Sequence, residues 1–278
     1  MGVQCLLLEC EREYASIAEH TGARSRRIAM IEIDRVAAVA REAGERILEV
    51  ARQGARTREK EDGSPVTDAD EAAHRTIVRR LRSLTPGIPV VSEESAQPAD
   101  AGGASRFWLV DPLDGTREFV DGEDEYTVNI ALVEAGAPVL GVVLAPARGV
   151  LYGGAAGEGA WRQNRDAPRT PITARSIPES GPVAAISRSH SNARTDAWLA
   201  KTGVTETLRA GSSLKFCLIA EGTVDVYPRL GRTMEWDTAA AHGVLLAAGG
   251  SVSTLAGTPL TYGKPGLENP HFVARGRQ

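Results

Sequence analysis

A short apolar run at residues 107–110 leads directly into the hexapeptide Asp-Pro-Leu-Asp-Gly-Thr at residues 111–116. The run is typical of a buried strand, so Asp111 and Asp114 are expected to emerge at its carboxyl end. Carboxylates and a backbone carbonyl that converge on one point suit a hard cation such as Mg²⁺. Gly115 lets backbone N–H groups approach a phosphate closely, and Thr116 can hold a water. A plain turn of the Asp-Pro-x-Asp-Gly type is the alternative interpretation.

The bulk composition is that of an ordinary globular protein. The chain has 278 residues, enough for one large domain or two small ones with a substantial core. Hydrophobic residues make up 42% of the chain and charged residues 24%, which does not suggest disorder, collagen or a coiled coil. The formal net charge of −4 does not favour a nucleic-acid polymer as partner. A small anionic substrate would need positive charge at its site, most simply as bound cations.

The cysteines and the apolar runs bear on the compartment. Cys5, Cys10 and Cys217 are too few and too scattered for a disulfide framework or a zinc cluster, which favours a reducing compartment. No apolar run approaches the roughly 18 residues of a membrane span. The first ten residues lack the basic flank and the small-residue cleavage site of a signal peptide. We predict a cytoplasmic protein without a transmembrane segment; loose association with the inner membrane stays open, because no motif addresses it.

The start of the chain differs from the rest. Residues 1–29 carry no clear turn signals and end in a basic cluster at 24–27. From Met30 to residue 51, apolar residues recur at helical spacing. We interpret residues 1–29 as an N-terminal appendage, either disordered or preceding the functional start at Met30. The remainder divides softly near 170–182, giving an N-terminal part over 30–175 and a C-terminal part over 176–278.

The two parts show different patterns. In the N-terminal part an exposed loop at 54–63 precedes a helix at 68–84, and short strands follow at 88–91 and 107–110. A β-rich stretch with glycine turns then predicts an antiparallel meander. Its expected strands are 126–134, 138–146, 150–152 and 159–161, with a turn at 153–157. In the C-terminal part alternation predicts an α/β layer, with strands at 183–187 and 223–227 and helices at 192–201, 213–221 and 235–248.

Five carboxylates stand at the ends of expected elements. Each one alone is weak evidence, because an acid at a helix start is usually a cap and loop acids are usually solvated. The combination of contexts is what indicates a site. The five are Asp70, Glu93, Asp111, Asp114 and Asp237.

Four motifs together resemble the inositol monophosphatase superfamily of Mg²⁺-dependent, lithium-sensitive phosphatases. They are the hexapeptide at 111–116, Glu-Trp-Asp-Thr-Ala-Ala at 235–240, Val-Thr-x-x-Asp at 66–70 and Ser-Glu-Glu-Ser at 92–95. The resemblance runs from about Met30 to the end of the chain. Within the superfamily the chain most resembles the 3′(2′),5′-bisphosphate nucleotidases of CysQ type, on the segments 117–119, 126–132, 187–190, 211–217 and 227–237. Arg117 stands where that type usually has Lys.

The resemblance implies a fold and a metal site. The implied fold is a layered sandwich of the α+β and α/β kind, with alternating helix and sheet layers and the active site between the two parts. Glu93, Asp111 and the carbonyl of Leu113 would hold one Mg²⁺, and Asp111, Asp114 and Asp237 a second. A third, weaker ion would lie near Glu93 and Asp70. The implied ligands are all oxygens, which suits Mg²⁺ and not zinc.

The resemblance also implies roles in catalysis and substrate binding. Asp70 and Thr116 would form a water-activating pair, and the backbone N–H groups of Gly115 and Thr116 would hold phosphate oxygens. A plain hydroxyl turn is the alternative for Thr116 read alone. The implied substrate contacts are Glu93, Leu113, Asp114, Gly115, Thr116, Ser187, His190, Gly211, Lys215 and Asp237.

The reaction implied by the resemblance is hydrolysis of the 3′-phosphate of 3′-phosphoadenosine 5′-phosphate, giving AMP and phosphate, a step that clears a by-product of sulfate assimilation. The alternatives are an inositol or sugar monophosphatase of the same superfamily and a non-catalytic nucleotide- or metal-binding module. Monomers and homodimers both occur on this fold. Whether the 5′-phosphosulfate analogue is also hydrolysed stays open.

Overall fold

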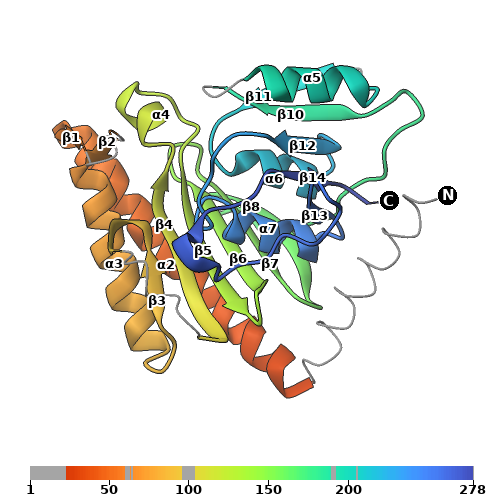
Figure 1. Ribbon diagram of the computed structural model, residues 1–278. Coiled ribbons are helices and arrows are strands. Elements are labelled where there is room, and N and C mark those ends of the chain that lie inside the picture. Colours follow the sequence, from red (N-terminus) through yellow and green to blue (C-terminus); the bar gives the residue numbers. More distant parts are fainter. Residues whose placement is uncertain are drawn as a thin grey trace.

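Helices and sheets alternate in five layers (Figure 1). The computed structural model describes residues 23–59, 63, 65–95, 104–188, 192–204 and 206–277. Along the layers, helices α2 and α3 cover a seven-stranded sheet, α6 and α7 lie between that sheet and a five-stranded one, and α5 covers the outer face. The predicted layered sandwich is therefore confirmed.

The outer helical layer consists of α2 (Ala23–Gln53) and α3 (Asp68–Leu84), which pack on each other and on the large sheet. The apolar face predicted from helical spacing is the buried one, from Ile33 to Ile47. Helix α2 begins at Ala23, upstream of Met30, because residues 23–29 contain neither Pro nor Gly to stop it. The rest of the predicted appendage, residues 1–22, lies outside the described residues.

A small hairpin replaces part of the predicted loop at 54–63. Strand β1 (Thr57–Glu59) pairs antiparallel with β2 (Pro65–Thr67). The loop prediction was wrong at 57–59. All three β1 residues are exposed, so the strand lacks the alternation of apolar and polar residues by which a strand is recognised in a sequence.

The large sheet follows chain order from β3 to β9, and all neighbours are antiparallel except β3 with β4. Its strands are β3 (Val90–Ser92), β4 (Arg106–Asp114), β5 (Thr127–Glu134), β6 (Ala137–Ala145), β7 (Val150–Ala155), β8 (Gly159–Asn164) and β9 (Thr170–Ile172). The predicted meander is confirmed. Gly153 and Gly154, predicted in a turn, lie inside β7 instead. A Cβ on Gly154 would lie 2.8 Å from the Cβ of Ala247, so glycine here permits close packing of α7 on the sheet.

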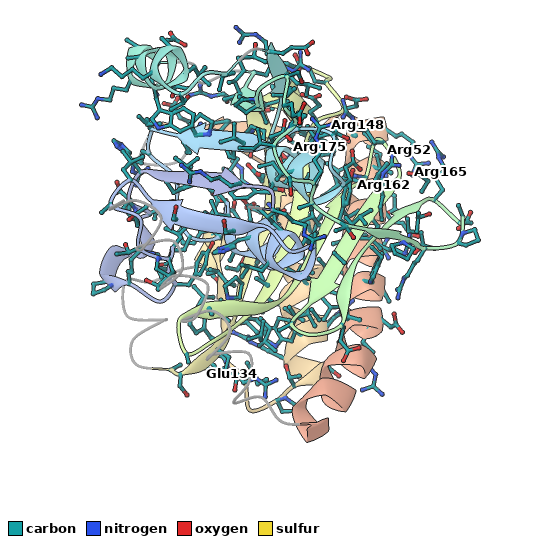
Figure 2. All side chains as sticks on the ribbon, turned by 90° about the vertical axis from the view of Figure 1, so that its right-hand side faces the viewer. Arg52, Glu134, Arg148, Arg162, Arg165 and Arg175 are labelled. Carbon is teal, nitrogen blue, oxygen red and sulfur yellow. The ribbon has the colours of Figure 1, made fainter. Side chains whose placement is uncertain are left out.

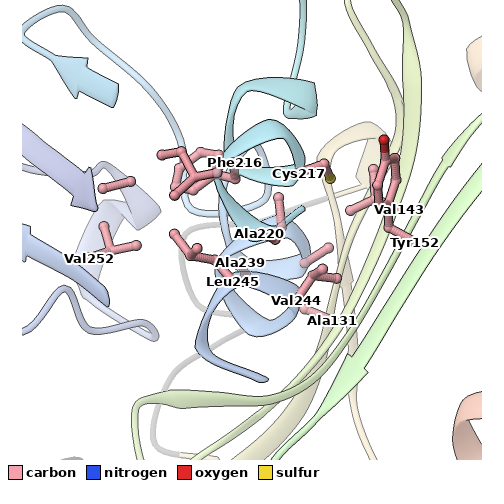
Figure 3. Close-up of a cluster of buried hydrophobic side chains, with 14 of the residues drawn as sticks. Ala131, Val143, Tyr152, Phe216, Cys217, Ala220, Ala239, Val244, Leu245 and Val252 are labelled. Atoms are coloured by element: carbon pink, nitrogen blue, oxygen red, sulfur yellow. The ribbon is translucent and has the colours of Figure 1, made fainter. Parts of the chain in front are cut away.

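The central layer is formed by α6 (Leu214–Ala220) and α7 (Ala239–Ala247), which pack on both sheets. Figure 3 shows the side chains of this core, including Phe216 and Cys217 from α6 and Val244 from α7. Cys217 is a buried free thiol, as expected for a small hydrophobic residue. The predicted helix at 235–248 was too long at its start, because residues 235–238 form a turn whose groups serve other contacts described below.

The five-stranded sheet has the order β11-β10-β12-β14-β13. Strand β10 is parallel to both β11 and β12, whereas β14 is antiparallel to β12 and β13. The elements are β10 (Val183–Ser187), α5 (Ala193–Lys201), β11 (Glu206–Ala210), β12 (Val226–Arg229), β13 (Ser251–Thr254) and β14 (Phe272–Arg275). The strand predicted at 223–227 thus lies slightly later in the chain. The predicted boundary near 175 falls between β9 and β10, and as a domain division it stays a prediction.

Candidate active site

One cavity of about 470 Å³ lies where the two sheets meet the segment before α7. Two sets of charged residues line it. Its acidic lining residues are Glu118 and the four that we call the acidic group, which are Glu93, Asp111, Asp114 and Asp237. Its basic lining residues, the basic group, are Arg117, Lys215, Arg229 and Arg232. Each set combines segments that are distant in the sequence, so the fold brings these segments together.

Three members of the acidic group converge on one point. A carboxylate oxygen from each of Glu93, Asp111 and Asp237 lies within 4.8 Å of the other two. Strands β3 and β4 pair in parallel with Ser92 opposite Val110, so Glu93 and Asp111 follow side by side at the same end of the sheet. Asp237 arrives from the turn before α7, where its Oδ2 accepts the N–H of Met234 at 2.8 Å.

The electrostatics of this cluster favour a cation. Burial raises the pKa of Asp111 well above its usual range, and the neighbouring charges of Glu93, Asp114 and Asp237 raise it further. Burial, followed by the charges of Asp114 and Glu93, raises the pKa of Asp237 to about 8. Converging carboxylates that repel one another, together with nearby oxygen donors, fit a hard divalent cation such as Mg²⁺.

Asp114 follows a register shift in β4, and it lies close enough to the cluster for its charge to raise the pKa of both Asp111 and Asp237. The register of β4 against β5 shifts between Asp111 and Asp114, and the strand continues through Asp114. The expectation that both carboxylates follow the strand was therefore wrong, since backbone pairing resumes between Asp114 and Thr127. Asp114 Oδ2 accepts the hydroxyl of Ser212 at 2.7 Å, and burial raises the pKa of its carboxyl.

The predicted catalytic pair is brought together. Thr116 Oγ1 donates to Asp70 Oδ1 at 3.2 Å and also lies 3.2 Å from the carbonyl oxygen of Leu113. Thr116 lines the cavity as the first residue of α4 (Thr116–Val120), directly after Gly115 with φ of +92°. Asp70 is 2% exposed and stands behind Thr116, outside the residues that line the cavity. Burial raises the pKa of Asp70, against hydrogen bonds from Thr67 that lower it.

The predicted substrate contacts are only partly assembled. Ser187 and Lys215 line the cavity. Gly211 is buried beside the cavity, and its N–H is taken by Glu125 Oε2 at 2.6 Å. His190 lies outside the described residues. Lys215 is 4% exposed, and its ammonium donates to the carbonyl oxygens of Ala210, at 3.2 Å, and of Ser212.

Arg229 and Ser212 line the cavity and were not among the predicted site residues. Arg229 is the last residue of β12. The sequence feature that could have identified it is a charged side chain at the end of a strand, the feature that was used for the carboxylates. Within the described part of the chain, its buried Nε has no hydrogen-bond partner. Ser212 has φ of +51°, a conformation that is uncommon for a residue other than glycine, and such strain clusters at functional sites.

The comparison with protein families decides the relationship. The profile described as "Inositol monophosphatase family" matches residues 30–275. The chain belongs to the inositol monophosphatase family. The site carboxylates and the Thr116–Asp70 pair all lie within the matched range, whereas residues 1–29 lie outside it.

Individual relatives show which members of the family the chain is similar to. The chain is 46% identical over 245 residues to "3′(2′),5′-bisphosphate nucleotidase CysQ" of Escherichia coli O157:H7, covering 86% of this chain and 98% of the relative. It is 41% identical over 233 residues to the CysQ nucleotidase of Buchnera aphidicola, covering 83% and 87%. The structure of CysQ from Bacteroides thetaiotaomicron superposes with a TM-score of 0.77 at 37% identity, covering 87% and 96%. The predicted relationship to CysQ-type proteins is confirmed.

A solved inositol monophosphatase from Anabaena shares the fold, with a TM-score of 0.72 at 26% identity and coverage of 89% and 91%. Across the described residues, every helix is too short or too polar to cross a membrane.

Proposed function

We propose that the chain is a Mg²⁺-dependent phosphatase that hydrolyses the 3′-phosphate of 3′-phosphoadenosine 5′-phosphate, giving AMP and phosphate. One observation carries this proposal: a single cavity holds the acidic group, the basic group and Thr116 hydrogen-bonded to Asp70. A substrate with two separate phosphates needs a reaction site for one and cationic donors for the other. The similarity to relatives named as CysQ nucleotidases supports the same substrate.

The acidic group would hold the metal. Glu93, Asp111 and the Leu113 carbonyl would take one ion, and Asp111, Asp114 and Asp237 a second, with a weaker third near Glu93 and Asp70. Bound Mg²⁺ would polarise the phosphoryl group and lower the pKa of the attacking water.

Residues of the chain would position the reactants. Asp70 accepts the hydroxyl hydrogen of Thr116, which leaves a lone pair of the Thr116 oxygen to orient the attacking water. The backbone N–H groups of Gly115 and Thr116, at the start of α4, would bind phosphate oxygens. Attack would be a direct in-line displacement, without a phosphoenzyme intermediate.

The basic group would bind the second phosphate and the nucleoside. Arg229 is best placed for the 5′-phosphate, because its buried Nε still lacks a partner among the described residues. Lys215, Ser187, Gly211 and His190 stay predicted contacts on the nucleotide side. The ammonium of Lys215 donates to two carbonyls, so it binds the ligand with its remaining donor or through the turn that it holds.

The alternative within the family is an inositol or sugar monophosphatase, favoured by the match to the family as a whole. The basic group argues against it, since a simple monoester has no second phosphate. A non-catalytic binding module would not need the Thr116–Asp70 hydrogen bond.

The deciding experiment is Mg²⁺-dependent phosphate release from 3′-phosphoadenosine 5′-phosphate, inositol 1-phosphate and fructose 1,6-bisphosphate, each with and without Li⁺. Strong preference for the nucleotide, blocked by Li⁺, is expected. Preference for inositol 1-phosphate would keep the metal site and discard the nucleotide contacts. Release from none of the three would favour the binding module. A cytoplasmic location, consistent with the scattered cysteines, and a monomer or homodimer belong to the same proposal.

A further inference from the structure

Glu125 is a buried residue that does not line the cavity. It contacts two turns that do, one on each side of the cavity. It stands just before β5 of the large sheet and is 5% exposed. Its Oε2 accepts the N–H of Gly211 at 2.6 Å and the Nε of Arg188 at 2.8 Å. These two donors directly follow β11 and β10 of the smaller sheet. Glu125 therefore links the ends of two strands of one sheet to the start of a strand in the other.

The carboxylate is charged and fully engaged. Its Oε1 accepts a guanidinium N–H at 2.8 Å from Arg148, which lies in the turn between β6 and β7. The side chain of Arg148 is labelled in Figure 2. Burial alone would raise the pKa of Glu125, but hydrogen bonds from Arg188 and Gly211 and the charge of Arg148 outweigh it, so the pKa is lowered. A buried carboxylate that accepts from three donors is held in a defined position.

The backbone of Glu125 is packed as tightly as its side chain. A Cβ on Gly211 would lie 2.8 Å from both the Cβ and the carbonyl oxygen of Glu125, so only glycine fits there. The same carbonyl oxygen would lie 3.3 Å from a Cβ on Gly115. Glu125 thus touches the turn that carries Thr116 and the turn that carries Ser212.

The second turn reaches both charged groups of the cavity. The Ser212 hydroxyl donates to Asp114 at 2.7 Å, and the Ser212 carbonyl accepts the ammonium of Lys215. A shift of Gly211 therefore moves an acidic and a basic residue together. We propose that Glu125 is a positioning residue, which sets the acidic group relative to the basic group through its bond to the Gly211 N–H. The inference rests on the proposed function, since it assumes a substrate that contacts both groups.

The test compares Glu125→Ala and Glu125→Asp with a matched control, Arg148→Gln. The control removes one ion pair from the same carboxylate but leaves the Gly211 bond in place. We expect the KM for 3′-phosphoadenosine 5′-phosphate to rise at least about tenfold in both Glu125 variants. Aspartate keeps the charge but is one methylene too short to reach Gly211. Arg148→Gln should change KM less than about twofold, because the bond to Gly211 and the ion pair with Arg188 remain and the Arg148 side chain is 37% exposed.

KM is the decisive reading because loss of stability alone lowers the folded fraction, and with it the apparent kcat, at unchanged KM. Unchanged KM in folded Glu125→Ala enzyme would overturn the proposal. If that variant does not fold, Gly211→Ala tests the same point with Glu125 and both ion pairs intact: its Cβ forces the turn away, and KM should rise equally. An unchanged KM in Gly211→Ala would also overturn it. Wild-type enzyme that prefers inositol 1-phosphate contradicts the proposed substrate, and with it the premise that one substrate contacts both groups. Unchanged KM in an enzyme that prefers the nucleotide contradicts the positioning role alone.

Discussion

The hydroxyl of Thr116 donates to the carboxylate of Asp70 at 3.2 Å, although 46 positions separate the two residues in the sequence. The other oxygen of Asp70 accepts both the N–H of Thr67, at 2.8 Å, and its hydroxyl, at 2.6 Å. The bond from the Thr67 N–H belongs to the capping box that begins α3. The start of a helix thus fixes the carboxylate that orients Thr116, so local helix chemistry and the candidate reaction depend on the same side chain.

Removing this hydroxyl should abolish most of the activity and spare the metal site. Thr116→Val keeps the shape but cannot orient a water, so we expect kcat to fall about 100- to 10,000-fold. Thr116→Ser, the matched control, keeps the hydroxyl and should retain most activity. Steady-state phosphate release gives kcat, and calorimetric titration gives the Mg²⁺ affinity, which should stay within about threefold of wild type because only the hydroxyl changes. Full activity of Thr116→Val would contradict the assignment.

The affinity for Mg²⁺ should rise with pH, because the carboxyl group of Asp237 loses its proton. Burial and the charges of Asp114 and Glu93 raise its pKa to about 8 in the metal-free protein. Below that pH the carboxyl holds a proton, which an incoming cation must displace, so apparent Mg²⁺ affinity should increase as pH approaches about 8. Titration calorimetry in buffers of different ionisation enthalpy measures the protons released. Asp237→Asn should bind more weakly and release fewer protons; equal proton release would contradict the raised pKa.

Arg229 should discriminate between substrates with and without a second phosphate. A charged hydrogen bond lost in Arg229→Gln should lower kcat/KM for 3′-phosphoadenosine 5′-phosphate about 10- to 100-fold. The value for 3′-AMP, which lacks the 5′-phosphate, should hardly change. Lys215→Ala tests the sequence prediction in the same assay: a raised KM for the bisphosphate alone supports direct contact. An equal effect on both substrates would mean that Lys215 acts through the carbonyls of Ala210 and Ser212.

Local signals in the sequence predicted local structure well. The helix at Asp68–Leu84 was predicted with its correct ends because Thr67 caps it and its first turn is acidic. The start of α7 was not, because residues 235–238 contain no helix breaker. Glu235 instead accepts the N–H groups of Gly263, at 2.6 Å, and Lys264, at 3.0 Å, from a distant loop. Such a tertiary contact outweighs helix propensity and leaves no trace in the local pattern.

In the site too, the sequence predicted what local motifs carry and missed what tertiary contacts determine. Glu93 follows β3, Asp111 lies inside β4 and Asp237 precedes α7. All three belong to motifs that resemble the family, so the sequence singled them out, and the structure brings them together. The bond from Ser212 to Asp114 spans 98 positions, and that from Gly211 to Glu125 spans 86. Both bonds depend on how the two sheets are placed relative to one another, which no spacing in the sequence encodes.

Residues 1–29 should be dispensable for activity. The family match begins at residue 30, and among the described side chains of α2 the buried ones run from Ile33 to Ile47. A chain starting at Met30 keeps that buried face and every described residue of the site. We expect its kcat/KM for 3′-phosphoadenosine 5′-phosphate to lie within about twofold of the full chain, because the described core and site residues stay in place. A large loss, with the shortened chain still folded, would give the segment a role in the site.

Acid should destabilise the protein through His242 in α7. This side chain is fully buried, its Nδ1 lies 2.8 Å from the hydroxyl of Tyr262, and burial lowers its pKa to about 3. In the unfolded state the imidazole has a pKa near 6.5 and takes up a proton, which it cannot do in the folded state at the same pH. The free energy of unfolding should therefore fall as pH drops from 6.5 toward 3, at most by about 1.4 kcal/mol per pH unit from this group.

Urea unfolding of wild type and His242→Asn across this range isolates the effect, because all other titrating groups cancel in the difference. Asparagine can still pair with Tyr262 but does not titrate, so the wild-type curve should lose stability faster as pH falls, and parallel curves would contradict a neutral buried His242.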